Sequence, residues 1–225
     1  MKDWSVGAEE LIHESVYEAH AHKDFLSDRL IQSLRTRRQI FSDHFIGSVL
    51  DDAWTVSGDA GFTAYLGESV FTPTTLDVVN SKVRINFNGV YCFRTSWFPK
   101  IVAVVRPPWL TDIKFEVTLF RDSDNYIGFR FDSSVSPNWY AVCRNGGVET
   151  AEDTGVAATS DFTELKADVE TVNIVRFTIN GVLKKTIGTN VPSTLLEPQI
   201  EVETLTDATK NLLIDSVDLY SDRRP

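Results

Sequence analysis

The chain has 225 residues, of which 42% are hydrophobic and 11% aromatic, as expected for a globular protein with one large domain or a medium domain plus a small appendage. Its net charge of −10 argues against nucleic acid binding and against an anionic membrane surface. The sequence has no apolar stretch of about 18 residues that could span a membrane, and its N-terminus has no signal-peptide-like apolar core.

Residues 8–38 are predicted to form a helix, because apolar residues recur at spacings of three, four and seven without an intervening Gly or Pro. Acidic residues gather in the first half and basic residues in the second, which complements the helix dipole. The apolar stripe consists of Ile12, Val16, Ala19, Leu26, Leu30 and Leu34. Such a stripe favours an oligomeric coiled coil, which we expect to give a homotrimer, or a docking helix; a helix packed on its own domain is the alternative.

From residue 41 onward, apolar residues alternate with polar ones, which is the pattern of half-buried strands. In the two clearest strands the side chains predicted to face inward are Ile113, Phe115, Val117, Leu119, Ile127, Phe129 and Phe131. Asn180-Gly181 between two apolar runs predicts a hairpin. About a dozen such segments without a helical interval predict an all-β fold. We expect a two-sheet antiparallel jelly-roll sandwich in residues 41–225, preceded by one N-terminal α-helix in residues 1–40.

Four segments, taken in order, resemble the concanavalin A-like lectin and glucanase sandwich, a group that includes laminin-G-like modules. They are residues 43–54 with Leu50-Asp-Asp-Ala-Trp54, residues 125–131, the hairpin in residues 177–182, and the closing run of residues 212–219. The resemblance covers about residues 41–221. It implies that the last strand returns beside the first.

A narrower resemblance involves residues 175–182, 190–198 and 213–217, which are similar to sandwich domains of tailed-bacteriophage virion proteins. Those proteins serve as capsid decoration proteins, head fibres or tail-fibre modules, often carry a short helix before the sandwich, and are commonly trimeric. The resemblance implies a non-enzymatic virion structural protein on the capsid surface or a fibre. Its N-terminal helix would attach to another virion protein, such as the major capsid protein.

Two other classes of function remain open on the sequence: a carbohydrate-binding module or tail-fibre lectin domain that binds host-surface glycans, and a glycoside hydrolase or lyase. Glycosidases of this fold class place acids on one strand in a pattern close to Glu-x-Asp-x-x-Glu. Glu201 and Glu203 share a strand face, but no acid follows two or three positions later, and Glu116 lies alone on a polar face. We therefore expect no catalytic residues.

One run of oxygen-bearing side chains could bind calcium. Asp122, Asp124 and Asn125 fall within four residues, and carboxylate and amide oxygens are calcium ligands. The same run is typical of a hairpin turn in which the side chains bond their own backbone. We expect no cofactor, with calcium at these three residues as the alternative.

Several aromatic residues near turns could form a sugar-stacking platform. Trp97, Trp109 and Trp139 lie beside prolines or turn residues, and Asn138 and Arg144 could donate hydrogen bonds to a glycan. The same tryptophans could instead fill the end of a sandwich. Cys92 and Cys143 both lie in strand-like runs, where buried thiols are common, and the sequence does not decide whether they pair.

Overall fold

The computed structural model describes residues 38–46, 50–59, 63–67 and 70–222. The predicted helix and its apolar stripe lie outside the described residues, except for Arg38. Arg38 begins the first strand, so the sandwich starts three residues before the expected boundary at residue 41. Within the described residues, no helix has both the length and the apolar character needed to cross a membrane.

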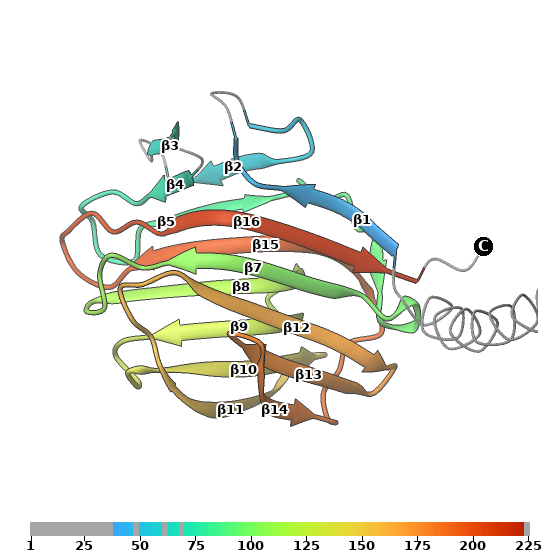
Figure 1. Ribbon diagram of the computed structural model, residues 1–225. Coiled ribbons are helices and arrows are strands. Elements are labelled where there is room, and N and C mark those ends of the chain that lie inside the picture. Colours follow the sequence, from blue (N-terminus) through green and yellow to red (C-terminus); the bar gives the residue numbers. More distant parts are fainter. Residues whose placement is uncertain (1–37, 47–49, 60–62, 68–69, 223–225) are drawn as a thin grey trace, which may run out of the picture. The chain divides into compact units, whose positions relative to one another are not determined.

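Sixteen described strands form two antiparallel sheets of eight, stacked on one another (Figure 1). In spatial order, sheet A contains β14 (Val182–Ile187), β13 (Ile174–Ile179), β12 (Thr163–Thr171), β7 (Lys100–Arg106), β16 (Leu213–Ser221), β4 (Val70–Thr74) and β3 (Thr63–Gly67), with β1 (Arg38–Asp43) also paired to β16. Sheet B contains β11 (Val148–Ala157), β10 (Asn138–Asn145), β9 (Asn125–Asp132), β8 (Ile113–Asp122), β15 (Leu195–Thr204), β5 (Lys82–Asn86) and β2 (Thr55–Gly58), with β6 (Phe93–Arg94) also paired to β15.

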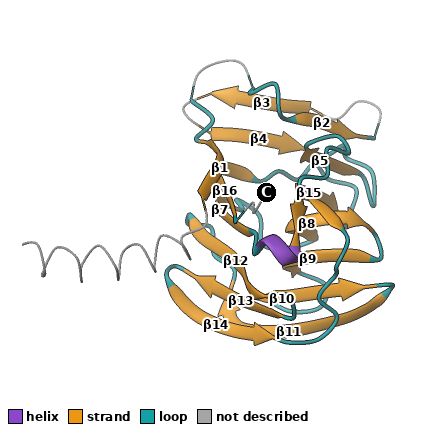
Figure 2. Cartoon of the chain, turned by 90° about the vertical axis from the view of Figure 1, so that its right-hand side faces the viewer, coloured by secondary structure: helices purple, strands orange, loops and turns teal. Residues whose placement is uncertain are grey.

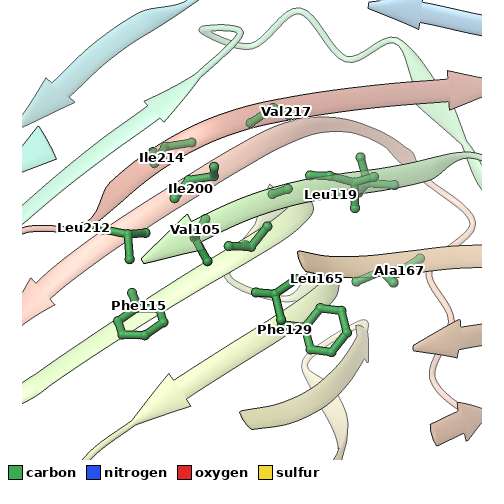
Figure 3. Packing of buried hydrophobic residues seen from close by; sticks show 14 of the residues in the cluster. Val105, Phe115, Leu119, Phe129, Leu165, Ala167, Ile200, Leu212, Ile214 and Val217 are labelled. Carbon is green, nitrogen blue, oxygen red and sulfur yellow. The ribbon is translucent and has the colours of Figure 1, made fainter. Parts of the chain in front are cut away.

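The core lies between the two sheets and confirms the alternation seen in the sequence. Every side chain predicted to face inward on β8 and β9 is buried: Ile113, Phe115, Val117, Leu119, Ile127, Phe129 and Phe131. Figure 3 shows Phe115, Leu119 and Ile200 of sheet B facing Val105 and Leu165 of sheet A. Complete burial of each such side chain contributes roughly 1.5–3 kcal/mol, so this shared core fixes which face of sheet B points outward.

Two expected connections are confirmed. Asn180 and Gly181 have φ angles of 48° and 75° and join β13 to β14, which is the geometry of a tight hairpin turn. The closing strand β16 pairs with β1 over Arg38 to Asp43, as the resemblance implies. Two interior strands, β16 of sheet A and β15 of sheet B, come from residues 195–221.

Strand β11 was not predicted. β11 lies at the edge of sheet B, and nine of its ten residues are at least partly exposed. An edge strand of this kind lacks the apolar alternation that identifies a strand in sequence. A register shift interrupts β11 near residues 153–157, where Gly155 has a φ of 69°. Figure 2 shows β11 beside β14, and Lys185 pairs with Glu152 there at 3.7 Å.

Candidate functional site

The predicted sugar platform is corrected by the positions of its tryptophans. Trp139 has no exposed surface because it occupies an inward position of β10, where it packs against Phe115 and Phe131. Trp97 and Trp109 lie near opposite ends of β16: the Trp97 carbonyl accepts a bond from Asp222, whereas the Trp109 indole donates to Asn211. The three rings do not come together.

The candidate hydrogen-bond donors are also separated. Asn138 and Arg144 both lie on the outward side of β10, but six residues apart, which is about 20 Å along a strand. The Asn138 amide donates to both carboxylate oxygens of Asp153 at 3.0 Å. A bond from the Gly155 amide and this one from Asn138 lower the pKa of Asp153. Of the predicted glycan-binding residues, only Arg144 contributes to the site described below.

Outward-facing side chains of sheet B form a continuous polar surface, which we call the polar face. The register of the strands arranges these side chains in rows that cross the sheet. One row contains Arg84, Glu201, Glu116, Arg130 and Tyr140 from five neighbouring strands. A second contains Gln199, Thr118, Gly128 and Val142, and a third contains Phe120, Tyr126, Arg144 and Glu149.

A cavity of about 440 Å³ is hollowed into the polar face, and we call it the large cavity. It is lined by Lys82, Arg84, Lys114, Glu116, Phe120, Ser123, Tyr126, Arg130, Arg144, Gln199 and Glu201. The first and third rows supply most of this lining, so the second row runs between them as a floor. The volume falls within the range of about 300–1,000 Å³ that is usual for small-molecule sites.

Two residues of the floor are unusual. Gln199 is only 2% exposed, and its Oε1 atom, next to the cavity, accepts no hydrogen bond. Gly128 has no room for a side chain, since a Cβ atom there would lie 2.1 Å from the Val117 carbonyl oxygen. Glycine therefore allows β8 and β9 to approach closely beneath the cavity. The result is a tight floor with one buried acceptor in need of a donor.

The carboxylates at one side of the large cavity are held by cations. Glu201 accepts from Arg84 at 2.9 Å and from Lys82 at 3.4 Å. Glu203 lies 3.1 Å from Lys82 and 3.6 Å from Lys114. Burial lowers the pKa of Lys82, but the two glutamates outweigh burial and raise it.

Glu116 lies in the same network, and its ionised form is disfavoured. Burial raises the pKa of Glu116; the charge of Glu201 adds to the rise, while Lys114 at 3.5 Å opposes it. Glu116 and Glu201 are opposite one another on β8 and β15. Like charges in that position are unfavourable unless cations compensate them.

A second cluster lies at the other side of the large cavity. Glu149 of β11 accepts two bonds from the Arg130 guanidinium, at 2.7 and 3.0 Å, and a short bond from the Tyr126 hydroxyl. Burial raises the pKa of Glu149, but these bonds outweigh burial and lower it. Burial and the bond to Glu149 raise the pKa of Tyr126 to about 12. Arg144 lies beside the same hydroxyl.

The candidate calcium ligands form the turn between β8 and β9. Asp122 Oδ1 accepts from the Asp124 amide at 3.0 Å and from the Asn125 side chain at 2.9 Å. The Asn125 oxygen accepts from the Gly146 amide at 3.1 Å. Oxygens that the backbone already uses in this way are typical of an Asx turn. Among the described residues, no group of three or more acidic, His or Cys side chains could hold a metal ion.

The possible catalytic acids on β15 are more numerous than the sequence pattern indicated. Glu197, Gln199, Glu201 and Glu203 alternate on the outward side, so Glu197 belongs to the same face. Glu197 is buried beneath residues 87–89 and accepts from the Gly89 amide at 2.9 Å. Burial raises the pKa of Glu197, while bonds from the Gly89 and Phe87 amides oppose that rise.

Cys143 lies on the core side of β10, next to the outward-facing Arg144. It is a free thiol, and burial raises its pKa. A neutral buried thiol is inert, so Cys143 contributes packing rather than chemistry.

The site contains residues that sequence reasoning did not single out, among them Gln199, Lys82, Arg84, Lys114 and Tyr126. Each occupies a polar position in an alternating strand, so the sequence does show that it faces outward. The jelly-roll crossovers decide which strands are neighbours, and they bring β5 with residue 82 beside β15 with residue 201. Local sequence patterns do not show these crossovers.

No protein-family model matches the sequence. No curated protein matches it either.

Several solved structures share the fold at low sequence identity. A β-1,3-glucanase from Mycobacterium marinum has a TM-score of 0.63 at 14% identity, covering 81% of this chain and 99% of its own. An endo-β-1,3-glucanase from Pyrococcus furiosus has a TM-score of 0.64 at 13% identity, covering 82% and 94%.

An immunostimulatory antigen and pseudo β-1,3-glucanase of Mycobacterium tuberculosis has a TM-score of 0.63 at 12% identity, covering 82% of this chain and 99% of its own. Proteins described as glucanases and as a pseudo-glucanase therefore share the architecture, so the architecture alone does not decide whether a sugar is cleaved. The described part of this chain has the concanavalin A-like glucanase sandwich fold, like that of a family 16 glycosyl hydrolase from Mycobacterium smegmatis.

Proposed function

We propose that this chain binds an oligosaccharide on the polar face of sheet B and does not hydrolyse it. The observation that carries the proposal is the buried Oε1 atom of Gln199, which borders the large cavity and has no donor. Leaving a buried acceptor unpaired costs about 1–3 kcal/mol, so a ligand hydroxyl that donates to it would remove this penalty.

The rest of the large cavity suits a molecule with many hydroxyl groups. Its lining is dominated by carboxylates, guanidinium groups and amines, which together accept and donate hydrogen bonds in several directions. Phe120 and Tyr126 add aromatic surface against which the apolar face of a sugar ring can pack. An apolar ligand would leave these charged groups desolvated and unpaired.

The absence of hydrolysis is proposed from the way the carboxylates are held. A retaining glycosidase needs one carboxylate free to attack the sugar and a second carboxyl that donates a proton. Here Glu201 is bound by Arg84 and Lys82, and Glu203 lies between Lys82 and Lys114. The raised pKa of Glu116 is a property that a general acid also needs, so the experiment must measure cleavage as well as binding.

The test is isothermal titration calorimetry of the full chain with a panel of tri- and tetrasaccharides, alongside an assay for released reducing ends. We expect binding without cleavage. Gln199→Leu should abolish binding while the melting temperature stays unchanged or rises, because the substitution removes an unpaired polar group. The absence of binding by every saccharide would refute the proposal. Cleavage that disappears in Glu116→Gln or Glu201→Gln would show an enzyme instead.

We also propose a virion location, on the evidence of the sequence alone. The apolar stripe of residues 8–38 on an otherwise charged segment favours attachment or trimerisation, and an attached sandwich would display the polar face to host-surface glycans. The test is the oligomeric state of the full chain and its attachment to phage particles with Leu26 and Leu30 both replaced by Asp. A monomeric wild-type chain that attaches to no particle would refute this role.

A further inference from the structure

The lining of the large cavity is rich in basic side chains, although the protein as a whole is acidic. Although the chain has a net charge of −10, five cations line the cavity against only two carboxylates. The cations are Lys82, Arg84, Lys114, Arg130 and Arg144, and the carboxylates are Glu116 and Glu201. Glu203 and Glu149, just outside this lining, pair with Lys82, Lys114 and Arg130, so the capacity to bind an anion depends on which cation lacks a close carboxylate.

Three of the five cations are engaged by short ion pairs. Arg84 contacts Glu201 at 2.9 Å, Lys82 contacts Glu203 at 3.1 Å, and Arg130 binds Glu149 through two nitrogens. Such pairs are close to neutral as units and are poor sites for a further anion.

Arg144 and Lys114 make only long contacts with protein carboxylates. Arg144 lies 3.6 Å from Asp124, and Lys114 lies 3.5 and 3.6 Å from Glu116 and Glu203, all beyond ordinary hydrogen-bond length. The Nε atom of Arg144 is buried and has no acceptor. Glu149 is the residue opposite Arg144 on β11, but its oxygens are taken by Arg130 and Tyr126. Arg144 therefore has unused capacity to bind an anion.

A smaller cavity of about 140 Å³ continues the polar face beyond the large one. It shares Lys114 and Arg130 with the large cavity and adds Tyr140, Asp132 and Val135. Tyr140 is half-buried, so its ring can pack against a sugar. From Gln199 on β15 to Arg144 on β10 there are three strand spacings of about 4.8 Å each, which is longer than one sugar ring.

We propose that the ligand is an acidic oligosaccharide whose carboxylate or sulfate group is bound by Arg144, while a hydroxyl of a neighbouring sugar unit donates to Gln199. This inference rests on the proposed sugar-binding function and adds the chemical class of the sugar. Placing the anion at Arg144 keeps it at the opposite side of the cavity from Glu201, which would repel it. Guanidinium groups suit both anions because their parallel N–H groups match two oxygens at once.

The experiment compares three ligands with the full chain by calorimetry: trigalacturonate for the carboxylate, a sulfated trisaccharide for the sulfate, and laminaritriose as the neutral control. We expect at least one acidic ligand to bind about tenfold or more tightly than the neutral one, with an affinity that falls as salt is raised. The preferred acidic ligand identifies which anion the site takes.

Arg144→Gln should remove most of the preference, so that the acidic ligand binds this variant little more tightly than laminaritriose does. The matched control is Arg176→Gln on β13 of the other sheet, where the arginine is paired with Glu170 and should not affect binding. Equal binding of acidic and neutral ligands would overturn this inference and leave the proposed function intact. An acidic preference that survives in Arg144→Gln would overturn the role of Arg144, and failure of all ligands to bind would overturn both proposals.

Discussion

Glu116 and Glu201 are opposite one another on the neighbouring strands β8 and β15, on the face of sheet B that points away from the core. Two like charges in this position destabilise a sheet, and here Lys114, Arg84 and Lys82 compensate them. The polar face is therefore a charge network as well as a binding surface, and its members should respond measurably to substitution and to pH.

Replacing Glu116 by Gln should raise the free energy of unfolding at neutral pH by roughly 0.2–1 kcal/mol, because it removes one of two opposed charges. Burial and Glu201 raise the pKa of Glu116 in the folded chain. Between the usual pKa of a glutamate and this raised pKa, the contribution of Glu116 to folding stability therefore falls as pH rises. The gain should accordingly shrink below the usual pKa of a glutamate, where both states are protonated. Urea unfolding between pH 3.5 and 7 measures it.

The control for this substitution is Glu164→Gln on β12 of sheet A, which should leave stability nearly unchanged. A Glu116→Gln variant that is less stable than wild type at pH 7 would show that its pairing with Lys114 outweighs the repulsion from Glu201.

Gly128→Ala should destabilise the chain by about 1–3 kcal/mol, because a Cβ atom at 2.1 Å from the Val117 carbonyl oxygen forces β8 and β9 apart. Gly188→Ala is the matched control: its Cβ would have no neighbour closer than 3.7 Å, so little change is expected. Equilibrium unfolding in urea compares the two. Equal effects of both substitutions would contradict the close approach of the strands.

Glu149→Gln should lower the pKa of Tyr126 from about 12, because the phenol loses a carboxylate acceptor whose charge opposes its ionisation. Burial persists in the variant, so the pKa should stay above the ordinary value of about 10. An ultraviolet absorbance titration measures the change, and Tyr126→Phe identifies which step belongs to this residue. An unchanged titration would mean that burial alone sets the pKa.

Calcium should not change the melting temperature relative to excess chelator. The oxygens of Asp122 and Asn125 already accept bonds within the hairpin turn, and Asp124 lies near Arg144. Because a ligand that binds only the native state raises its stability, a scan with and without calcium is a direct test. A rise of several degrees that is lost in Asp122→Asn would establish a calcium site.

The Leu26→Asp, Leu30→Asp double variant should be monomeric by light scattering if residues 8–38 drive trimer formation, since each copy would place two charges in an apolar seam. The β-sheet circular dichroism should remain unchanged, because the sandwich has its own complete core. A wild-type chain that is monomeric at tens of micromolar would end the trimer hypothesis.

The sequence predicted the sandwich well wherever one side of a strand faces the core. The alternation from Ile113 to Leu119 and from Ile127 to Phe131 identified the inward residues correctly, and Asn180-Gly181 identified a hairpin. Alternation failed for β11, because an edge strand with few buried positions has no apolar period. The prediction that Trp139 belongs to a sugar platform was also wrong. Its inward position on β10 buries it, although a proline lies nearby in the sequence.

The site was less predictable than the fold, for a physical reason. Arg84, Gln199 and Arg144 come from three strands separated by long stretches of sequence, and only the pairing order of sheet B brings them to one cavity. The unpaired oxygen of Gln199 is a property of that assembled environment. In the sequence it is simply a polar residue between two apolar ones.

The interior positions of β15 and β16 imply that neither sheet can be completed until residues 195–221 have been synthesised. While the ribosome still holds residues 195–221, sheet A lacks the strand that joins β7 to β4, and sheet B lacks the strand that joins β8 to β5. The earlier hairpins can pair locally, but neither sheet can close before these residues have left the ribosome. Pairings this distant in sequence give slow folding, on the order of milliseconds to seconds, during which the exposed edges of β7 and β8 depend on protection from aggregation.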